Sequence, residues 1–432
     1  MKPVKFFISK LGAIRDSEVE LSPLMIFSGE SGLGKSYVSF LVHYLYVLLM
    51  PDTDNRPREN RLFKFFEKEN FDFKSLFEDN EKRNGIILTI KKEYLLKWIN
   101  SDAITYIAYL LGHKDFEGEV KIELPLDEDL SFLCKENMMG LTNNEEIVYK
   151  LSLGSLSYNL PIGLIDNVSS VFNLLLIAYI RKILFGDFLS NLRTFLMPPS
   201  RGSLVELNLK PAFLSGMYEE FFDTWKDLER PLKDVSYQIP QSLSECLSDI
   251  NTGSLQRIEG KIIYQTTNGD SMPITAAASS IKELAPLSMF FQKCSPKDAS
   301  ILFEEPEAHL HPARQIKVAD LIGCAIGLGS HIQITTHSDY FLTQINNLIK
   351  LYYIKEKNLQ KFNEICTELN FKEESIINPT SVRAYVLRRR DDGSTEILNQ
   401  EIGKEGIPFT SFYDVINSDL HKSHVLNKAL EE

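Results

Sequence analysis

The sequence predicts an α/β fold with a mixed sheet and an inserted, mainly helical arm or subdomain. Two observations indicate the α/β core. A glycine-rich loop, Gly29–Ser36, lies between a strand-like and a helix-like run, and two later apolar runs end in polar residues, at Glu304–Glu305 and at His337. Buried strands of α/β sheets are near-continuous apolar runs, and their carboxyl ends form ligand sites.

The loop fits the pattern Gly-x-x-x-x-Gly-Lys-Ser/Thr. Leu24–Phe27 has the character of a strand, and Tyr37–Leu45 has helical apolar spacing, so the flanks disfavour a chance match in a glycine-rich turn. Such a loop brings backbone N–H groups to a phosphate at a helix N-terminus. The predicted phosphate-binding residues are Gly29, Glu30, Ser31, Gly32, Leu33, Gly34, Lys35 and Ser36, with Lys35 neutralising β/γ charge and Ser36 holding Mg²⁺.

A second apolar run, from Ala299 to Phe303, predicts a buried strand that delivers two carboxylates. Glu304 is the predicted Mg²⁺ ligand, and Glu305 is predicted to polarise the water that attacks a γ-phosphate. The alternative is an acidic turn after a core strand.

A third run, from His331 to Thr335, predicts another strand. His337 follows it and is predicted to sense the γ-phosphate. The alternative is a structural histidine at a strand end, which the order of the three segments disfavours.

The length of 432 residues, 44% of them hydrophobic, predicts about two to three domains. A polar, turn-rich break at 51–58 opens an insertion. We therefore predict an N-terminal part of the core at 1–50, an insertion at 51–257 and a C-terminal part at 258–432.

Several smaller features complete the expected architecture. Helical patterning covers 167–196 and 211–228, and Asp391–Gly393 predicts a hairpin. The apolar run at 171–180 is shorter than the ~20 residues of a membrane span, and the N-terminus lacks a signal-peptide pattern, so we expect a cytoplasmic protein without a membrane partner. Arg201, in a Pro/Gly turn, is expected either to reach a phosphate or an interface carboxylate, or to be a surface arginine.

The formal net charge of −12 gives no overall attraction to a polyanion, so binding of nucleic acid needs a local basic patch. A solvated surface is the favoured interpretation of the basic residues that offer one. They are Lys350, Lys355, Lys357, Arg383, Arg388, Arg389 and Arg390.

Together the loop, the Glu304–Pro312 run and the Thr336–Ser338 strand end resemble the ABC-type ATPases of the SMC, RecF and OLD group. They are most similar to the stand-alone, OLD-like branch of AAA-family ATPases. The resemblance covers roughly 1–50 and 258–419. It implies ATP and Mg²⁺ as cofactors and an ATP-sandwich dimer, in which a signature segment of one subunit closes on the nucleotide of the other.

The candidate signature segment is Ala276–Leu284, in which Ser279 and Ser280 are the expected ligands of the γ-phosphate. Simple N-capping of the following helix is the alternative role. Ile281 stands where the family usually has glycine, and this departure leaves close approach in trans in question. The glutamine of the family's Q-loop has no assigned position.

The stand-alone members that this chain resembles include ATPase subunits of bacterial antiphage systems, such as those of the PARIS and Septu types. The resemblance implies an ATP-hydrolysing homo-oligomer that senses a phage-encoded trigger and gates a separate effector, a nuclease. One alternative is a RecF- or SMC-like repair ATPase that binds DNA directly, which the acidic charge and the lack of a long heptad pattern disfavour. A second alternative, a P-loop kinase for a small molecule, is disfavoured by the late acidic strand and His337.

Overall fold

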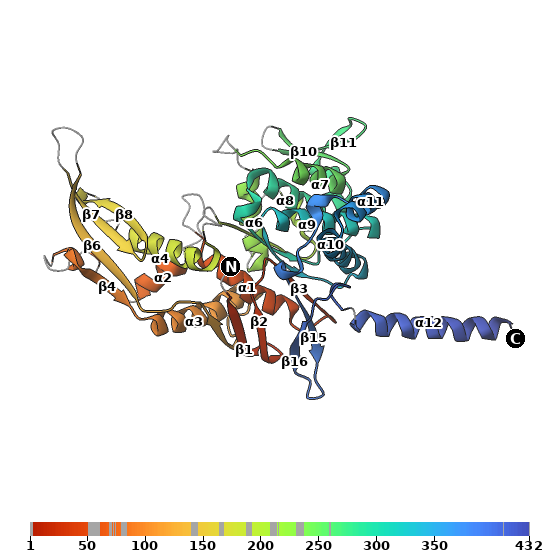
Figure 1. The fold of residues 1–432 in the computed structure, drawn as a ribbon, viewed down its shortest axis with the longest axis horizontal. Helices are drawn as coiled ribbons and strands as arrows, with labels where there is room; N and C mark the ends of the chain where they lie inside the picture. The colour runs from red at the N-terminus through yellow and green to blue at the C-terminus, as the bar shows by residue number, and fades with distance from the viewer. Residues whose placement is uncertain are drawn as a thin grey trace.

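The computed structural model describes residues 3–50, 61–68, 71, 73, 75–78, 84–139, 146–163, 168–186, 192–207, 214, 216–229, 237–258, 261–408 and 410–431. Figure 1 shows a central body, an arm that extends to one side of it, and the C-terminal helix α12 (Thr410–Glu431), which points away from the body on the other side.

A nine-stranded mixed sheet forms the middle of the body, in the order β5-β1-β2-β16-β15-β3-β14-β13-β9. The run from β15 to β9 is parallel, whereas β16 pairs with β15, and β1 with both β2 and β5, in the antiparallel sense. The predicted α/β fold with a mixed sheet is thus confirmed. The strands are β1 (Lys5–Leu11), β2 (Ile14–Glu20), β3 (Leu24–Gly29), β5 (Gly118–Glu123), β9 (Arg193–Met197), β13 (Ala299–Glu304), β14 (His331–Thr335), β15 (Val382–Arg389) and β16 (Thr395–Gln400).

The central parallel strands are buried on both faces, which explains their continuous apolar sequences. Every residue of β13 and β14 is buried. Alternate residues of β3 enter different cores: Met25 and Phe27 join one, and Leu24 and Ile26 the other. This follows from the two-residue period of a strand. The sheet therefore separates two hydrophobic cores.

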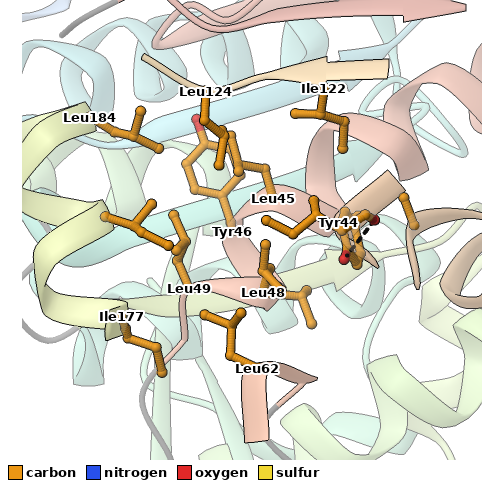
Figure 2. Packing of buried hydrophobic residues seen from close by; sticks show 14 of the residues in the cluster. Tyr44, Leu45, Tyr46, Leu48, Leu49, Leu62, Ile122, Leu124, Ile177 and Leu184 are labelled. Atoms are coloured by element: carbon orange, nitrogen blue, oxygen red, sulfur yellow. Dashed lines mark hydrogen bonds between the residues drawn. The ribbon is translucent and has the colours of Figure 1, made fainter. Parts of the chain in front are cut away.

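The first core contains α1 (Lys35–Leu48), the helix that follows the glycine-rich loop. Figure 2 shows Leu45, Leu48 and Leu49 at the end of this helix, packed among Leu62, Ile122, Ile177 and Leu184 from the arm and from β5. Burial of each such leucine contributes about 1.5–3 kcal/mol. The helix at the loop is thus packed against the arm as well as the sheet.

Helices on the other face form the second core around β13 and β14. A small antiparallel sheet, β10-β11-β12, precedes α8. The elements of this part are α5 (Arg201–Val205), α6 (Met217–Glu229), α7 (Gln241–Asn251), β10 (Gly253–Ile258), β11 (Lys261–Thr266), β12 (Ser271–Pro273), α8 (Ser279–Lys293), α9 (Pro312–Gly327), α10 (Asp339–Lys357) and α11 (Leu359–Leu369).

In its described residues, the arm combines a four-stranded antiparallel sheet, β4-β6-β7-β8, with the helices α2, α3 and α4. Within the described residues, α4 is the helix long and apolar enough by composition to cross a membrane, and 61% of it is buried inside the protein. Its buried side belongs to the first core. The elements are α2 (Arg61–Lys68), β4 (Ile86–Ile90), α3 (Lys92–Leu111), β6 (Leu130–Met139), β7 (Glu146–Leu153), β8 (Leu156–Pro161) and α4 (Val168–Phe185).

Two expectations about residues 51–257 need correction. The helix expected over 167–196 ends at Phe185, and β9 follows, because the apolar residues Phe195–Met197 are buried beside β13. In addition, β5 and β9 are strands of the large sheet, so this segment contributes to the core as well as to the arm. The division at 50 and 257 stays a prediction. The hairpin at Asp391–Gly393 is present between β15 and β16.

Candidate nucleotide-binding site

The loop between β3 and α1 owes its shape to glycine. Gly29, Gly32 and Gly34 have φ angles of 126°, 79° and 97°, which residues with a side chain rarely adopt. A Cβ atom on Gly29 would lie 2.5 Å from the backbone carbonyl oxygen of Leu387. The backbone therefore favours glycine at the two glycine positions of the pattern, Gly29 and Gly34, and also at Gly32 between them.

The ammonium group of Lys35 lies over this loop. Its Nζ atom donates hydrogen bonds to the carbonyl oxygens of Gly29 (3.0 Å) and Glu30 (2.7 Å). Burial lowers the pKa of Lys35, and nearby carboxylates, foremost that of Glu305, oppose this shift. Lys35 is thus a cation held at the loop among acidic neighbours.

The strands that carry the acidic and histidine residues lie beside β3. Because β14 pairs in parallel with both β3 and β13, the carboxyl ends of the three strands meet at the loop. A cavity of about 390 Å³ opens there. It is lined by Gly12, Ala13, Ser31, Gly32, Gly34, Lys35, Ser36, Tyr37, Glu305, Thr335 and His337.

Three residues of the predicted loop set are absent from this lining: Gly29, Glu30 and Leu33. The side chain of Glu30 is exposed, whereas Leu33 is 2% exposed and packs in the first core. A contribution of either residue to phosphate binding would therefore come from its backbone N–H group. The role of each loop residue stays a prediction.

Glu304, the last residue of β13, is buried and 1% exposed. Burial raises the pKa of its carboxyl group to about 7, and a hydrogen bond from Ser36 acts against that rise. Among the described residues, its Oε1 atom has no hydrogen-bond partner. A buried carboxylate oxygen without a partner, next to a hydroxyl group, fits a hard cation such as Mg²⁺, which Ser36 and Glu304 would hold.

Glu305 lines the cavity and has a backbone φ of 45°, a conformation that costs about 1–3 kcal/mol and is concentrated at functional sites. Its backbone N–H donates to the carbonyl oxygen of Thr335 at 2.9 Å, which fixes the turn after β13. His337 is half-buried. Burial lowers its pKa, Lys35 adds to that effect and Glu305 opposes it, so the imidazole is neutral near pH 7.

A residue to which the sequence assigned no role, Glu307, joins these two strand ends. Its carboxylate accepts a hydrogen bond from the backbone N–H of His337 (2.6 Å) and another from the hydroxyl of Thr336 (3.0 Å). Burial raises its pKa, and these hydrogen bonds counteract the rise. The sequence feature that points to Glu307 is its position two residues after Glu305, in the segment that follows β13.

Arg201 takes neither of its expected places. It is 0% exposed, and it donates from Nη1 to the carbonyl oxygens of Pro198 (3.1 Å) and Glu304 (3.0 Å). From Nε it donates to the carbonyl oxygen of Glu283 (3.0 Å), whose carboxylate lies 3.6 Å away. Burial lowers its pKa to about 10, so it stays charged. It therefore ties the end of β13 to α8 instead of reaching a ligand.

The predicted signature serines stand at the start of α8 and are not among the residues that line the cavity. The N-cap of this helix is Ala278, without a side-chain cap, so N-capping by Ser279 or Ser280 is not their role. Ser279 is exposed, and the hydroxyl of Ser280 accepts a hydrogen bond from Arg314 at 2.7 Å. Ile281, in place of the expected glycine, is 2% exposed and packs in the second core.

Part of the chain matches a known domain family. The AAA ATPase domain family matches residues 205–342, which include Glu304, Glu305 and His337. No curated protein sequence matches the chain.

Among solved structures, the SMC head domain from Thermotoga maritima has 10% identity and a TM-score of 0.34, with 93% of this chain and 100% of that chain covered. The Smc head domain with an extended coiled coil derived from Pyrococcus furiosus, bound to the C-terminal domain of ScpA, has 13% identity and a TM-score of 0.36, with 99% and 100% covered.

The matched segment contains the carboxyl ends of β13 and β14, and the glycine-rich loop lies beside both of them. The chain is therefore an ATPase, and its residues 205–342 are similar to the AAA ATPase domain family.

Proposed function

We propose that the chain binds ATP with Mg²⁺ in the cavity at the loop and hydrolyses it there. The observation that carries this proposal is the convergence of Lys35, Glu305 and His337 on one cavity. Lys35 would neutralise charge between the β- and γ-phosphates, and Glu305 would accept the proton of the attacking water. Mg²⁺, bound by Ser36 and Glu304, would spread the charge of the phosphates. The neutral imidazole of His337 would contact the γ-phosphate.

We also propose that two copies of the chain complete each site. Ser279 and Ser280 lie at the N-terminus of α8, and a helix N-terminus is a favourable place for a phosphate. Neither serine lines the cavity of its own subunit. A second copy can bring them to the nucleotide. The resemblance to ABC-type ATPases supports this arrangement.

Mixed dimers test the composite site. Lys35→Ala removes the loop half, and Ser279→Arg blocks the serine half, so each variant alone is expected to be inactive. Mixed 1:1, they should recover about a quarter of wild-type hydrolysis, because random exchange makes half of the dimers mixed and each mixed dimer keeps one of two intact sites. Absence of recovery, with mixed dimers confirmed by native mass spectrometry, would refute the composite site.

The biological role that we propose is that of a sensor subunit in a bacterial antiphage system, where ATP turnover gates a separate effector nuclease in response to a phage-encoded trigger. The resemblance to defence ATPases supports this role. In the described part of the chain, no group of three or more His, Cys, Asp or Glu residues is placed to hold a metal ion.

Purified protein is expected to leave DNA and RNA intact in the presence of ATP and Mg²⁺ or Mn²⁺. Toxicity in cells should require the product of a neighbouring gene together with an intact Lys35. Nucleic-acid cleavage by the chain alone that survives Lys35→Ala would contradict the sensor role.

The alternative, direct DNA binding, has less support from the surface. Several residues of the candidate basic patch lie beside carboxylates: Lys355 is 2.8 Å from Glu373, and Arg388 is 2.6 Å from Glu396. These carboxylates offset the positive charge that a phosphate backbone needs. A gel shift with ATP distinguishes the alternatives, since tight, salt-sensitive binding of DNA would favour the repair ATPase.

A further inference from the structure

Arg314 joins three segments at the start of α8. It lies in the first turn of α9, and its Nη1 atom donates a hydrogen bond to the hydroxyl oxygen of Ser280 at 2.7 Å. Its Nη2 atom donates to the hydroxyl oxygen of Thr252 at 3.2 Å. Thr252, between α7 and β10, has a φ of 50°, so its place is set by a tight left-handed turn.

A guanidinium group is well suited to hold a hydroxyl group in one orientation. It is planar and always charged, and here two of its nitrogens donate to two hydroxyl oxygens, those of Ser280 and Thr252. Since the Ser280 oxygen accepts from Arg314, the hydroxyl proton of Ser280 remains available to another acceptor. A cationic donor also polarises that hydroxyl, and charge-assisted hydrogen bonds are about twice as strong as neutral ones.

Arg314 follows Glu305 by nine residues in the sequence. Glu305 lines the cavity of its own subunit, whereas neither Arg314 nor Ser280 does. The contact with Ser280 instead groups Arg314 with the serine half of the site.

We propose that Arg314 is a positioning residue of the half-site that acts in trans. It holds the hydroxyl of Ser280 so that its proton is donated to the γ-phosphate on a second copy of the chain. This inference rests on the composite site proposed above. It adds Arg314 as the group that orients the hydroxyl of Ser280.

Steady-state ATP hydrolysis provides the first test. Arg314→Ala should lower kcat about 10-fold to 100-fold with KM for ATP nearly unchanged, since the loop that binds the nucleotide is intact. Lys317→Ala, three residues along the same helix and exposed, is the matched control and should keep wild-type kcat. In a Ser280→Ala background, Arg314→Ala should cause little further loss, because the hydroxyl through which it acts is gone.

Mixing experiments distinguish the two halves. Arg314→Ala mixed with Lys35→Ala should recover activity as Ser279→Arg mixed with Lys35→Ala does, whereas Arg314→Ala mixed with Ser279→Arg should gain nothing above Arg314→Ala alone. These outcomes would place Arg314 in the serine half, which a general loss of folding would not do.

Two results would overturn the inference separately from the proposed function. If the Ser279→Arg and Lys35→Ala pair recovers but the Arg314→Ala and Lys35→Ala pair does not, Arg314 is not in the trans half and the composite site stands. Independent losses from Ser280→Ala and Arg314→Ala would also refute the positioning role. If the reference pair itself fails, the composite site is refuted, and the role of Arg314 with it.

Discussion

The replacement Glu307→Gln tests how the histidine strand end is held at the site. Gln keeps the shape of the side chain but removes its charge and puts an NH₂ group where one carboxylate oxygen was. In the structure the two oxygens accept from the His337 backbone N–H at 2.6 Å and from the Thr336 hydroxyl at 3.0 Å. One charge-assisted hydrogen bond is lost, and the other weakens to a neutral one. A loss of about 1.5–3 kcal/mol follows, or roughly a 10-fold to 150-fold fall in kcat if His337 contacts the transition state.

Steady-state hydrolysis in a double-mutant cycle with His337→Ala measures this effect. If Glu307 acts by positioning His337, the double variant should be no slower than His337→Ala alone. The exposed Glu128→Gln serves as the control and should leave kcat unchanged. Fully additive losses, or an unchanged kcat for Glu307→Gln, would refute the positioning of His337 by Glu307.

Four further changes have defined outcomes. Lys35→Ala should abolish ATP binding measured by calorimetry, because the loop loses its cation; unchanged affinity would refute the loop assignment. Glu305→Gln should keep ATP binding and slow hydrolysis ~10²–10⁴-fold in a single-turnover assay, since the general base is removed. A normal rate would show that Glu305 is not the general base. Arg201→Met should lower the free energy of unfolding in urea by about 3–5 kcal/mol, because the buried carboxylate of Glu283 loses its cationic partner and three carbonyl oxygens lose their hydrogen-bond donor. A loss below about 1 kcal/mol would show that these contacts contribute little. Burial lowers the pKa of His331 from 6.5 to about 4, so the unfolded state takes up the proton first as pH falls. The free energy of unfolding should therefore decrease by about 3 kcal/mol between roughly pH 6.5 and pH 4. His331→Asn should remove that part of the pH dependence.

The sequence by itself determined the parts of the site that depend on local chain properties. A loop that needs positive φ angles requires glycine, and Gly29, Gly32 and Gly34 show it in their spacing. Strands buried on both faces need continuous apolar runs, so β13 and β14 could be located, and with them Glu305 and His337. These features are visible because each is set by a few consecutive residues.

The tertiary structure alone decided which distant groups meet. Arg201 looks like a turn residue in the sequence, yet burial beside β13 and α8 makes it a link between them. The apolar run of β9 could extend the helix before it, and its place beside β13 makes it a strand. Glu307 and Arg314 act on groups about 30 residues away, at His337 and Ser280. Such pairings arise from the packing of strands and helices, and periodicity within one segment carries no information about them.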